Sequence, residues 1–451
     1  MKSKKSFSLN KAISDHKIIL SIYGLGNVGG PITAAWLRKG AKIIGVDISK
    51  KLLQEIKQNN SHKHEPFISE IFSKSLSNGS LVLTKDGIDA SKKSQIKFVA
   101  VPVALKNKKI DLTTIKNVIE NISKGLKKGD SVVVCPSLPP GTCEKILLPI
   151  LEKNSKLKCE RDFHLIYNPE RIFEGRALQD IEENYPAIVS GLGKNSLNFA
   201  KKLLKIISKK GVLPMSDIAS AESEKLFEGV YRDVNIALAN ELSTFCNSTG
   251  TNYWEIIKAA NSQPFCHLHY PGTGVGGLCI PVYPQFIINS AKKLNINTKL
   301  IEFAREFNDK MPITCAKEAL KLIKNQKIKK KKIAVLGLGF RGDVYDSRLS
   351  PTYSVVNTFL KNGFEVSVHD PFITHDDTLP QNVNLSKNLS KTVKNACLIF
   401  ISTDHKQYGK LTKKQLVSTD NPIPIYDGRN ILNKKNFSGI KLVTIGNQNM
   451  K

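Results

Sequence analysis

Short apolar segments rich in β-branched residues alternate with helical stretches over the first two hundred residues. The apolar runs occupy residues 17–23, 41–46, 96–101, 131–134 and 163–167. Alternation of this kind is typical of a parallel sheet with helices packed on both faces. The pattern therefore predicts an α/β domain with a doubly wound sheet.

The pattern changes between about 219 and 249, where apolar residues recur at helical spacing without interruption and Gly250 follows. About thirty residues of helix extend roughly 45 Å at 1.5 Å per residue, more than a small domain requires. We predict a long connecting helix that also packs against a partner subunit, and thus a homodimer or larger homo-oligomer.

After a lysine-rich run at 327–332 the first pattern begins again. Residues 332–342 repeat the strand, glycine turn and helix pattern that begins at residues 18–29, and each copy precedes a second strand that ends in aspartate, Asp47 or Asp370. We predict two Rossmann-like, nucleotide-binding-type domains at 1–210 and 326–451, joined by a helical central domain at 211–325.

Length and composition agree with a multidomain globular protein. The chain has 451 residues, of which 41% are hydrophobic, and its eight cysteines are scattered without a Cys-x-x-Cys pair. Residues 1–5 are not followed by the apolar stretch that a signal peptide requires. No apolar run approaches the roughly 20 residues of a membrane span. We expect reduced thiols, a cytoplasmic location and no membrane span.

The formal net charge of +29 fits three situations: nucleic-acid binding, an anionic small-molecule substrate, or lysines spread over every exposed face. The lysines recur throughout the chain, and the densest run precedes an apolar strand, as a solvated linker would. No helix-turn-helix, aromatic-studded sheet or zinc-finger spacing accompanies the charge. We favour dispersed lysines and predict no nucleic-acid partner.

Gly24, Gly26 and Gly29 form a G-x-G-x-x-G motif between a strand and an expected helix, and Asp47 follows Gly24 by 23 positions. The first glycine permits the turn, the second lets the backbone approach a pyrophosphate, and the third allows close helix packing. Asp47 is placed to accept hydrogen bonds from a ribose 2′-hydroxyl and would repel a 2′-phosphate. The motif predicts NAD rather than NADP.

The second glycine motif, Gly337, Gly339 and Gly342, is weaker because Asp370 follows its first glycine by 33 positions. It binds either a different nucleotide or none. Arg341 and Arg348 lie near this turn, and a guanidinium suits phosphate or carboxylate, although an exposed arginine usually has no specific ligand.

A single thiol, Cys279, lies in the glycine-built segment 271–281. Glycines allow positive φ and close approach to a ligand, and a thiolate adds readily to an aldehyde. The alternative is a small buried cysteine on a tight turn. Together with the dinucleotide motif, the segment indicates a hydride-transfer enzyme that also forms a covalent bond to its substrate.

These features, in this order, resemble the nucleotide-sugar 6-dehydrogenases, the family of UDP-glucose and UDP-N-acetylhexosamine dehydrogenases. The resemblance covers nearly the whole chain. Besides the glycine motifs and the Cys279 turn, its distinctive segments are 137–142, 168–175, Ala221 and Glu222 with Lys225, 340–343, 346–351 and 427–430.

The resemblance implies an NAD-dependent, four-electron oxidation of a primary alcohol on a UDP-sugar to a carboxylate, with two NAD consumed. Cys279 is similar to the family nucleophile, which forms a thiohemiacetal that a second hydride transfer converts into a thioester. Lys225 matches the cation that stabilises the alkoxide and later oxyanions. Glu174 matches the carboxylate that assists hydrolysis, and Glu170 and Ser137 match neighbouring active-site positions.

The resemblance also implies that the domain at 1–210 binds NAD, that the domain at 326–451 binds the nucleotide sugar, and which residues bind each ligand. The cofactor positions are Gly24, Gly26, Asn27, Val28, Gly29, Asp47, Pro102 and Ser137. The substrate positions are Glu170, Arg171, Lys225, Arg232, Gly276, Arg341 and Arg429, where Arg341 replaces the more usual lysine.

The chain departs from the family pattern at several of these places. Gly229 replaces an asparagine four residues after Lys225, Tyr283 replaces an aspartate four residues after Cys279, and Leu278 replaces a histidine. Val103 and Ala104 replace a Thr-Pro pair near the nicotinamide. We expect Gly229 to leave room for a water or a bulkier substrate group, and the identity of the general base stays open.

The segment that contains Glu170 and Arg171 favours UDP-N-acetylmannosamine or UDP-N-acetylglucosamine as substrate. Glu174 and Gly175 with Asp180 keep UDP-glucose as the alternative. The run 266–269, Cys-His-Leu-His, lacks a fourth ligand, so we predict no metal and expect its histidines to line the sugar pocket. The expected product is a uronic acid donor for surface polysaccharide or glycan assembly.

Two other classes of function remain to be distinguished. A nucleotide-sugar-binding protein that has lost its chemistry through Gly229 and Tyr283 would bind UDP-sugar without forming NADH. A two-electron dehydrogenase of simple hydroxy acids would form one NADH and would not need the C-terminal repeat. The presence of Cys279 and Lys225 favours the four-electron enzyme.

Overall fold

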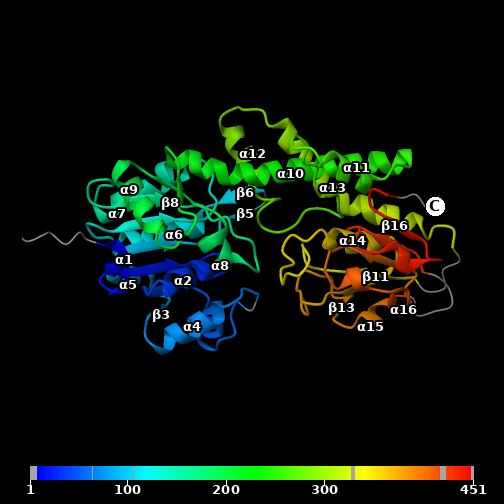
Figure 1. The fold of residues 1–451 in the computed structure, drawn as a ribbon, viewed down its shortest axis with the longest axis horizontal. Helices are drawn as coiled ribbons and strands as arrows, with labels where there is room; N and C mark the ends of the chain where they lie inside the picture. The colour runs from blue at the N-terminus through cyan, green and yellow to red at the C-terminus, as the bar shows by residue number, and fades with distance from the viewer. Residues whose placement is uncertain (1–7, 63, 107, 327–330, 417–422, 448–451) are drawn as a thin grey trace, which may run out of the picture. The chain divides into compact units, whose positions relative to one another are not determined.

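The computed structural model describes residues 8–62, 64–106, 108–326, 331–416 and 423–447. Residues 1–5 and most of the lysine-rich run, for which we predicted no signal peptide and a solvated linker, lie outside these ranges. The chain forms two compact units (Figure 1). The first contains residues up to 228 together with 285–294, and the second contains residues 229–284 together with those from 295 onward.

The described part of the first unit is built on an eight-stranded sheet of order β10-β9-β8-β7-β4-β1-β2-β3. Strands β1 to β8 of this sheet pair in parallel, whereas β9 runs antiparallel to β8 and parallel to β10. The strands are β1 Ile19–Tyr23, β2 Lys42–Val46, β3 Leu81–Thr84, β4 Ile96–Val99, β7 Ser131–Val134, β8 His164–Tyr167, β9 Ala187–Gly191 and β10 Val212–Pro214. All five strands predicted in this region are present.

Helices cover both faces of this sheet. Side chains alternate across each strand, so its apolar residues are presented to both faces and are buried there by helices. In β7, Val133 packs into the core beside α2, α4 and α9, whereas Val132 and Val134 pack into the core beside α5, α6 and α7. These helices are α2 Gly29–Arg38, α4 Ile68–Ser77, α5 Gly87–Lys93, α6 Thr113–Ser123, α7 Leu148–Ser155 and α9 Lys194–Leu204. The doubly wound α/β architecture is confirmed.

The second unit has a six-stranded, fully parallel sheet of order β13-β12-β11-β14-β15-β16. Alternate residues of β11 again face two cores, with Ile333 and Val335 on one side and Ala334 and Leu336 on the other. The strands are β11 Lys332–Leu336, β12 Glu365–His369, β13 Asn384–Ser386, β14 Leu398–Ile401, β15 Ile425–Asp427 and β16 Leu442–Thr444. The prediction of a second Rossmann-like domain is confirmed.

The predicted connecting helix is α10, Ile218–Thr249, a continuous helix of 32 residues. In the second unit a buried polar network joins it to α13, Lys299–Lys321. Arg305 donates from Nη1 to Asp233 Oδ1 at 2.5 Å, and Asn308 donates to the same oxygen at 2.8 Å. Because each charge in this network faces an opposite charge or a hydrogen-bonding group, the network fixes how the two helices pack.

The second glycine turn differs from the prediction in one respect. Helix α14, Thr352–Lys361, begins ten positions after Gly342, whereas α2 begins at Gly29, the third glycine of the first turn. The second copy therefore keeps the expected order of strand, glycine turn and helix, but residues 343–351 form an additional loop between its turn and its helix.

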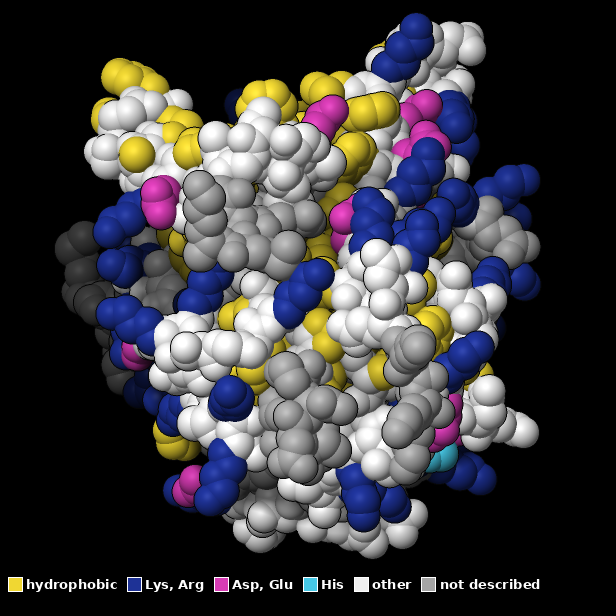
Figure 2. All heavy atoms as spheres, turned by 90° about the vertical axis from the view of Figure 1, so that its right-hand side faces the viewer, with side chains coloured by type: hydrophobic (Ala, Val, Ile, Leu, Met, Phe, Trp, Pro, Cys, Tyr) yellow, Lys and Arg dark blue, Asp and Glu magenta, His cyan; other side chains and the backbone are white. Residues whose placement is uncertain are grey.

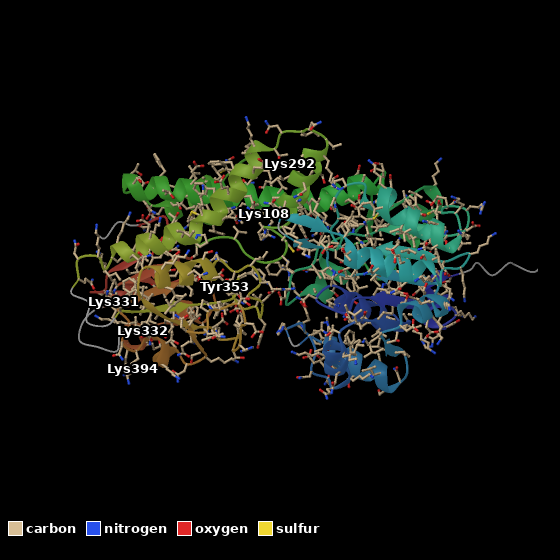
Figure 3. All side chains as sticks on the ribbon, turned by 180° about the vertical axis from the view of Figure 1, so that it is seen from behind. Lys108, Lys292, Lys331, Lys332, Tyr353 and Lys394 are labelled. Carbon is tan, nitrogen blue, oxygen red and sulfur yellow. The ribbon has the colours of Figure 1, made fainter. Side chains whose placement is uncertain are left out.

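Basic side chains are spread over the surface. Figure 2 shows Lys and Arg scattered among uncharged side chains over the face it presents. Lys332, at the end of the lysine-rich run, donates from Nζ to the carbonyl oxygens of Lys394 at 3.0 Å and Lys391 at 3.3 Å (Figure 3). This lysine thus caps the end of α15, Leu389–Val393, by binding carbonyls of its last turn. Among the described residues, no helix has both the length and the apolar character needed to cross a bilayer.

Candidate active site

The glycine turn after β1 leaves an open space at its second glycine. Gly24 has a φ of +88°, and a Cβ at Gly29 would lie 1.7 Å from the Gly24 carbonyl oxygen, so the first and third positions require glycine. A Cβ at Gly26 would meet no atom within 4 Å. The N-cap residue of α2, Val28, forms no side-chain cap, so the turn presents a helix N-terminus beside an open space, as a phosphate cradle does.

Asp47 follows β2 and is hydrogen-bonded to this turn. Its Oδ2 accepts the Leu25 N–H at 2.9 Å, and its Oδ1 accepts the Ser49 N–H at 2.9 Å. Each carboxylate oxygen has a further lone pair, which is available to a ribose hydroxyl. The structure thus places Asp47 beside the three glycines, as the sequence predicts, and holds its carboxylate in one orientation.

His62 also lies on the turn, and the sequence motif gave no indication of it. Its Nε2 lies 2.8 Å from the Leu25 carbonyl oxygen, and a Cβ at Gly30 would lie 2.3 Å from the same nitrogen. Burial lowers the pKa of His62, although hydrogen bonds to the Gly26 and Leu25 carbonyls oppose the shift. A neutral ring that donates from Nε2 fits these contacts. A fourth glycine directly after the motif is the signal that could have suggested a ring packed there.

The loop that follows β7 carries Ser137, and Glu222 of α10 holds this loop. The Glu222 carboxylate accepts the Gly141 N–H at 2.5 Å and the Cys143 N–H at 2.9 Å. Burial raises the pKa of Glu222 to about 7, although hydrogen bonds from Cys143 and Gly141 oppose the rise. Because Lys225 lies one helical turn after Glu222, these bonds connect the Ser137 loop to the segment of α10 that carries the lysine.

Glu170, Arg171 and Lys225 come together in the first unit. Burial raises the pKa of Glu170 to about 7, and the positive charges of Lys225 and Arg171 oppose the rise. The Lys225 ammonium lies 3.5 Å from Glu228 Oε2, one turn further along α10. The cluster therefore contains a carboxyl group that titrates near neutral pH next to a fixed cation.

Arg171 is also held by protein groups. Its Nη2 donates to the Pro186 carbonyl at 2.7 Å, Nη1 lies 3.7 Å from Glu228 Oε1, and the guanidinium lies over the Tyr185 ring. These contacts fix the orientation of the Arg171 side chain. A role in binding substrate stays a prediction.

The remaining first-unit positions lie on loops. Glu174 is half-buried, and the Glu65 carboxylate accepts the N–H groups of Gly175 at 2.7 Å and Ala177 at 2.9 Å, which fixes the loop that carries Glu174. Pro102 is exposed after β4. A Cβ at Gly24 would lie 3.0 Å from the Ala100 carbonyl oxygen, so the β4 end that leads to Pro102 adjoins the glycine turn.

In the second unit, the Cys279 turn packs on the loop that follows the second glycine motif. A Cβ at Gly276 would lie 2.6 Å from the Leu349 carbonyl oxygen, and one at Gly277 would lie 2.8 Å from the Phe340 ring. The Gly277 N–H donates to the Arg348 carbonyl at 3.0 Å. The glycines therefore allow close packing on residues 340–351 and hold the turn in place.

Cys279 is exposed, whereas the other seven cysteines are buried or half-buried. The alternative of a small buried cysteine on a tight turn is therefore wrong. An exposed thiol on a turn fixed by its glycines is accessible to a ligand, and that is the first requirement of a nucleophile.

Arg429 lies at the start of the same turn. A Cβ at Gly272 would lie 2.6 Å from Arg429 Nη1, and Arg429 Nε donates to the Ser402 carbonyl at 2.8 Å. The Gly272 N–H donates to Asn240 Oδ1 at 2.9 Å. Arg341, which follows Phe340 in the chain, is half-buried. The structure thus brings Gly276, Arg341, Arg429 and the Cys279 turn into one region of the second unit.

The second glycine turn is closed by carboxylates of the chain itself. Asp370 Oδ2 accepts the N–H groups of Leu338 at 2.7 Å and Gly339 at 2.9 Å, and Asp404 Oδ1 accepts that of Gly342 at 2.8 Å. Amides bound in this way cannot also bind phosphate. Of the two possibilities that the sequence left open for this turn, the geometry favours no bound nucleotide phosphate at the turn itself.

Arg232 and the 266–269 run both belong to the second unit. Arg232 is exposed on α10, and burial lowers the pKa of His269, with the charges of His267 and Arg232 lowering it further. The rings of His267 and His269 lie edge to face at 5.6 Å. Within the described ranges, no three His, Cys, Asp or Glu side chains converge as metal ligands.

Comparison with known proteins covers almost the whole chain. Residues 18–208 match the NAD binding domain of the UDP-glucose/GDP-mannose dehydrogenase family, residues 219–310 its central domain and residues 334–434 its UDP binding domain.

The curated relatives that are 32% identical to this chain include two whose names differ. One is the UDP-N-acetyl-D-mannosamine dehydrogenase of Methanocaldococcus jannaschii, over 95% of this chain and 96% of the relative. The other is the NDP-N-acetyl-D-galactosaminuronic acid dehydrogenase of Ralstonia solanacearum, over 91% of this chain and 96% of the relative.

Two solved structures have similar folds. The UDP-D-ManNAc dehydrogenase of Pyrococcus horikoshii superposes with a TM-score of 0.87 at 31% identity, covering 96% of this chain and all of that one. A UDP-glucose dehydrogenase of Pyrobaculum islandicum gives a TM-score of 0.84 over 95% of this chain and 98% of that one, and at 22% identity it supports the fold alone.

Proposed function

Because the chain belongs to the UDP-glucose/GDP-mannose dehydrogenase family, we propose that it oxidises the 6-hydroxymethyl group of UDP-N-acetylmannosamine or UDP-N-acetylglucosamine to a carboxylate. Membership makes the protein an NAD-dependent nucleotide-sugar dehydrogenase. The observation that supports the four-electron reaction is the exposed Cys279 on a turn packed against the UDP binding domain.

The residues of the first unit fit NAD. The open space at Gly26 and the uncapped start of α2 suit a pyrophosphate, and the Asp47 carboxylate suits a ribose hydroxyl. Asn27 and Val28 lie within the same turn, and Pro102 and Ser137 lie on the loops after β4 and β7. When bound, NAD accepts the hydride in each of the two oxidations.

In the proposed first oxidation, the hydroxyl proton leaves as the carbon loses hydride, and the product is an aldehyde. Lys225 stabilises the alkoxide by its charge. Glu170, with a pKa raised by burial to about 7, is suited to accept the proton near neutral pH. This assignment gives the unidentified general base a candidate in the first unit.

In the second oxidation, Cys279 Sγ bonds to the aldehyde carbon to give a thiohemiacetal, and loss of a second hydride gives a thioester. Water then adds to the acyl carbon and the C–S bond breaks, which releases the carboxylate and returns the thiol. Glu174 is proposed to orient or deprotonate that water. The overall change converts one alcohol, one water and two NAD⁺ into one carboxylate, two NADH and three protons.

The proposed substrate class rests on the relatives. Their names specify N-acetylated hexosamine or hexosaminuronic acid nucleotides, in line with the segment around Glu170 and Arg171. In this proposal Arg341 and Arg429 bind the diphosphate or the sugar near the Cys279 turn, with Gly276 allowing close approach. Arg171 and Arg232 complete the substrate set, and UDP-glucose remains the competing substrate.

We also propose that the enzyme is a homodimer or a larger homo-oligomer. Four large apolar side chains on one stripe of α10 are exposed to the extent of 58%, 51%, 42% and 63%: Phe227, Tyr231, Leu238 and Phe245. A second copy is the proposed occupant of this stripe. The division into domains at 1–210, 211–325 and 326–451, and the cytoplasmic location, belong to the same proposal.

The deciding experiment incubates the purified protein with NAD and a panel of UDP-sugars and follows the absorbance of NADH. Two NADH per UDP-N-acetylmannosamine or UDP-N-acetylglucosamine would support the proposal. Two NADH only with UDP-glucose would reassign the substrate. Binding without NADH would indicate a protein that binds nucleotide sugars without chemistry, and one NADH per sugar would exclude the thioester step.

A further inference from the structure

Gly229 lies inside α10, where a glycine loses more backbone freedom on folding than any other residue. It is buried, and the ring of Tyr283 lies directly on it. A Cβ at position 229 would lie 2.5 Å from Tyr283 Cδ2 and 3.0 Å from Tyr283 Cβ. Real Cβ atoms do not approach carbon atoms so closely, so any other residue at 229 would displace the tyrosine ring.

This contact changes the interpretation of both departures from the family pattern. The sequence led us to expect that Gly229 leaves room for a water or a bulkier substrate group. That expectation is wrong for the space beside its α-carbon, because the Tyr283 ring fills it. The two replacements, Gly229 for asparagine and Tyr283 for aspartate, are therefore one coupled change, since a tyrosine packed in this way excludes an asparagine at 229.

Tyr283 is in turn bonded to the residue that carries the thiol. The Tyr283 N–H donates to the Cys279 carbonyl at 2.9 Å, and the Val282 N–H donates to the same oxygen at 3.1 Å. Tyr283 is also the first residue of α12, Tyr283–Lys293. Cys279 and Tyr283 are thus the first and last residues of one backbone turn, with the thiol at one end and the packed ring at the other.

We propose that Tyr283 is a positioning residue for Cys279: its ring, packed on Gly229, fixes the segment 279–283 against α10, and Gly229 and Tyr283 act as one pair. The Cys279 carbonyl accepts hydrogen bonds from the backbone N–H groups of Val282 and Tyr283. Displacement of the Tyr283 ring therefore also displaces Cys279 and its thiol. The steric part of this inference stands on the contacts alone, whereas its effect on turnover rests on the proposed function.

A double-mutant cycle tests the pair on the intact protein, with Gly229→Ala, Tyr283→Ala and the double variant. Two quantities are measured: the rate at which iodoacetamide alkylates Cys279, followed by mass spectrometry of its peptide, and the thermal midpoint. With Tyr283 present, Gly229→Ala should lower the midpoint and change the alkylation rate at least about three-fold, because the new methyl displaces the ring.

In the Tyr283→Ala background, the effect of Gly229→Ala on the thermal midpoint should have the opposite sign. The same Gly229→Ala change should raise the midpoint, because alanine is a better helix former than glycine and no ring opposes it. The alkylation rate should then stay within about two-fold of the Tyr283→Ala value. Effects of Gly229→Ala that are equal in the two backgrounds would overturn the proposal.

Tyr283→Phe is the conservative control because it keeps the ring. With an active substrate, Tyr283→Ala should lower kcat by about 10²-fold while KM changes less than about three-fold, since a misplaced nucleophile affects the reaction more than binding. Tyr283→Phe should keep kcat within about three-fold of the original enzyme. A phenylalanine variant as slow as the alanine variant would overturn the packing role.

The alkylation and thermal measurements need neither NAD nor a UDP-sugar. If no UDP-sugar yields NADH, the proposed function fails while the cycle still decides whether the pair exists. If turnover is normal and the cycle is additive, the pair fails while the proposed function stands.

Discussion

The two glycine turns of this chain begin with nearly the same sequence and differ in what surrounds them. At the first turn, a Cβ on the middle glycine would meet nothing within 4 Å, and α2 starts at the third glycine. An aspartate accepts the N–H after the first glycine in both turns, but at the second turn Asp370 and Asp404 also accept the N–H groups of the other two glycines. Helix α14 starts ten positions after the third glycine of this turn.

The difference shows how one motif supports two functions. The first turn has an open space and a free helix N-terminus, which are the requirements of a phosphate site. At the second turn, carboxylates of the chain bind the N–H groups and backbone carbonyl oxygens occupy the space beside Gly339; the turn leads into residues 340–351, on which the Cys279 turn packs. In the second copy the motif therefore organises a loop that supports the thiol, and the four predictions below test this division of roles.

The largest effect is expected for Cys279→Ser. Formation of carboxylate should fall at least about 10³-fold, because a hydroxyl does not supply a comparable nucleophile, while the Kd for NAD, which depends on the first unit, should change little. Product analysis and NAD titration measure the two quantities. Cys397→Ser, a half-buried cysteine of the second unit, is the matched control. Full carboxylate production by Cys279→Ser would remove the thiol from the mechanism.

The next largest effect concerns the acid–base group of the first unit. Since burial raises the pKa of Glu170 to about 7, the carboxylate that accepts the proton forms as the pH rises through about 7. We therefore expect kcat/KM of the original enzyme to rise over this pH range. The kcat/KM of Glu170→Gln should be about 10²-fold lower and should not rise over the same range. Glu120→Gln, at an exposed glutamate of α6, is the surface control, and an unchanged rise of kcat/KM with pH in Glu170→Gln would assign the base elsewhere.

A third prediction tests the closed turn. Burial opposes ionisation of Asp370, but hydrogen bonds from His405 and from backbone N–H groups outweigh it and lower its pKa to about 2. A depressed folded-state pKa gives stability that is present above about pH 4 and is lost as the pH falls toward 2. The shift corresponds to about 2 kcal/mol.

Asp370→Asn should therefore destabilise the second unit at pH 6 by about 2 kcal/mol, and this gap should shrink at pH 3. Urea unfolding at the two pH values, followed by the fluorescence of Trp254, measures the difference, because Trp254 packs against the core of the second unit. A gap that is equal at both pH values would contradict the role of the ionised carboxylate.

The smallest expected effect is a change in the Kd for NAD, and it compares the two glycine turns directly. Gly26→Ala should raise the Kd for NAD about 10-fold with little change in stability, because its methyl enters the open space. Gly339→Ala, the equivalent change in the second turn, should leave the Kd for NAD unchanged. Calorimetric titration of both variants provides the measurement, and equal weakening of NAD binding would show that the turns do not differ in this role.

The sequence predicted the elements of the fold well. Five strands of the first sheet, the long helix α10 and the second Rossmann-like unit all appear where the apolar pattern placed them. Local pattern was sufficient because each element must bury an apolar face of fixed period. The loop at 343–351 that precedes α14 was not predicted, because it packs against the Cys279 turn, some seventy residues earlier in the chain.

The candidate site was only partly accessible to sequence reasoning. The motifs identified the glycines, Asp47, Lys225 and Cys279, whereas His62 and Glu222 entered through contacts with backbone groups distant in sequence. Gly30 could at most have suggested that a ring packs there, and it did not identify His62; no local pattern marks a carboxylate bound to the loop after β7. Such contacts exist only when separate segments pack together.

By itself, the sequence determined the periodicity of strands and helices, the positions where glycine is required, and the family to which the chain belongs, because each of these depends on neighbouring residues or on ordered motifs. Only the tertiary structure decided that one glycine turn is open and the other closed, that Cys279 is exposed, and that Tyr283 fills the space beside Gly229. These features depend on which distant atoms occupy a given space, and excluded volume and hydrogen bonding in the folded chain settle that.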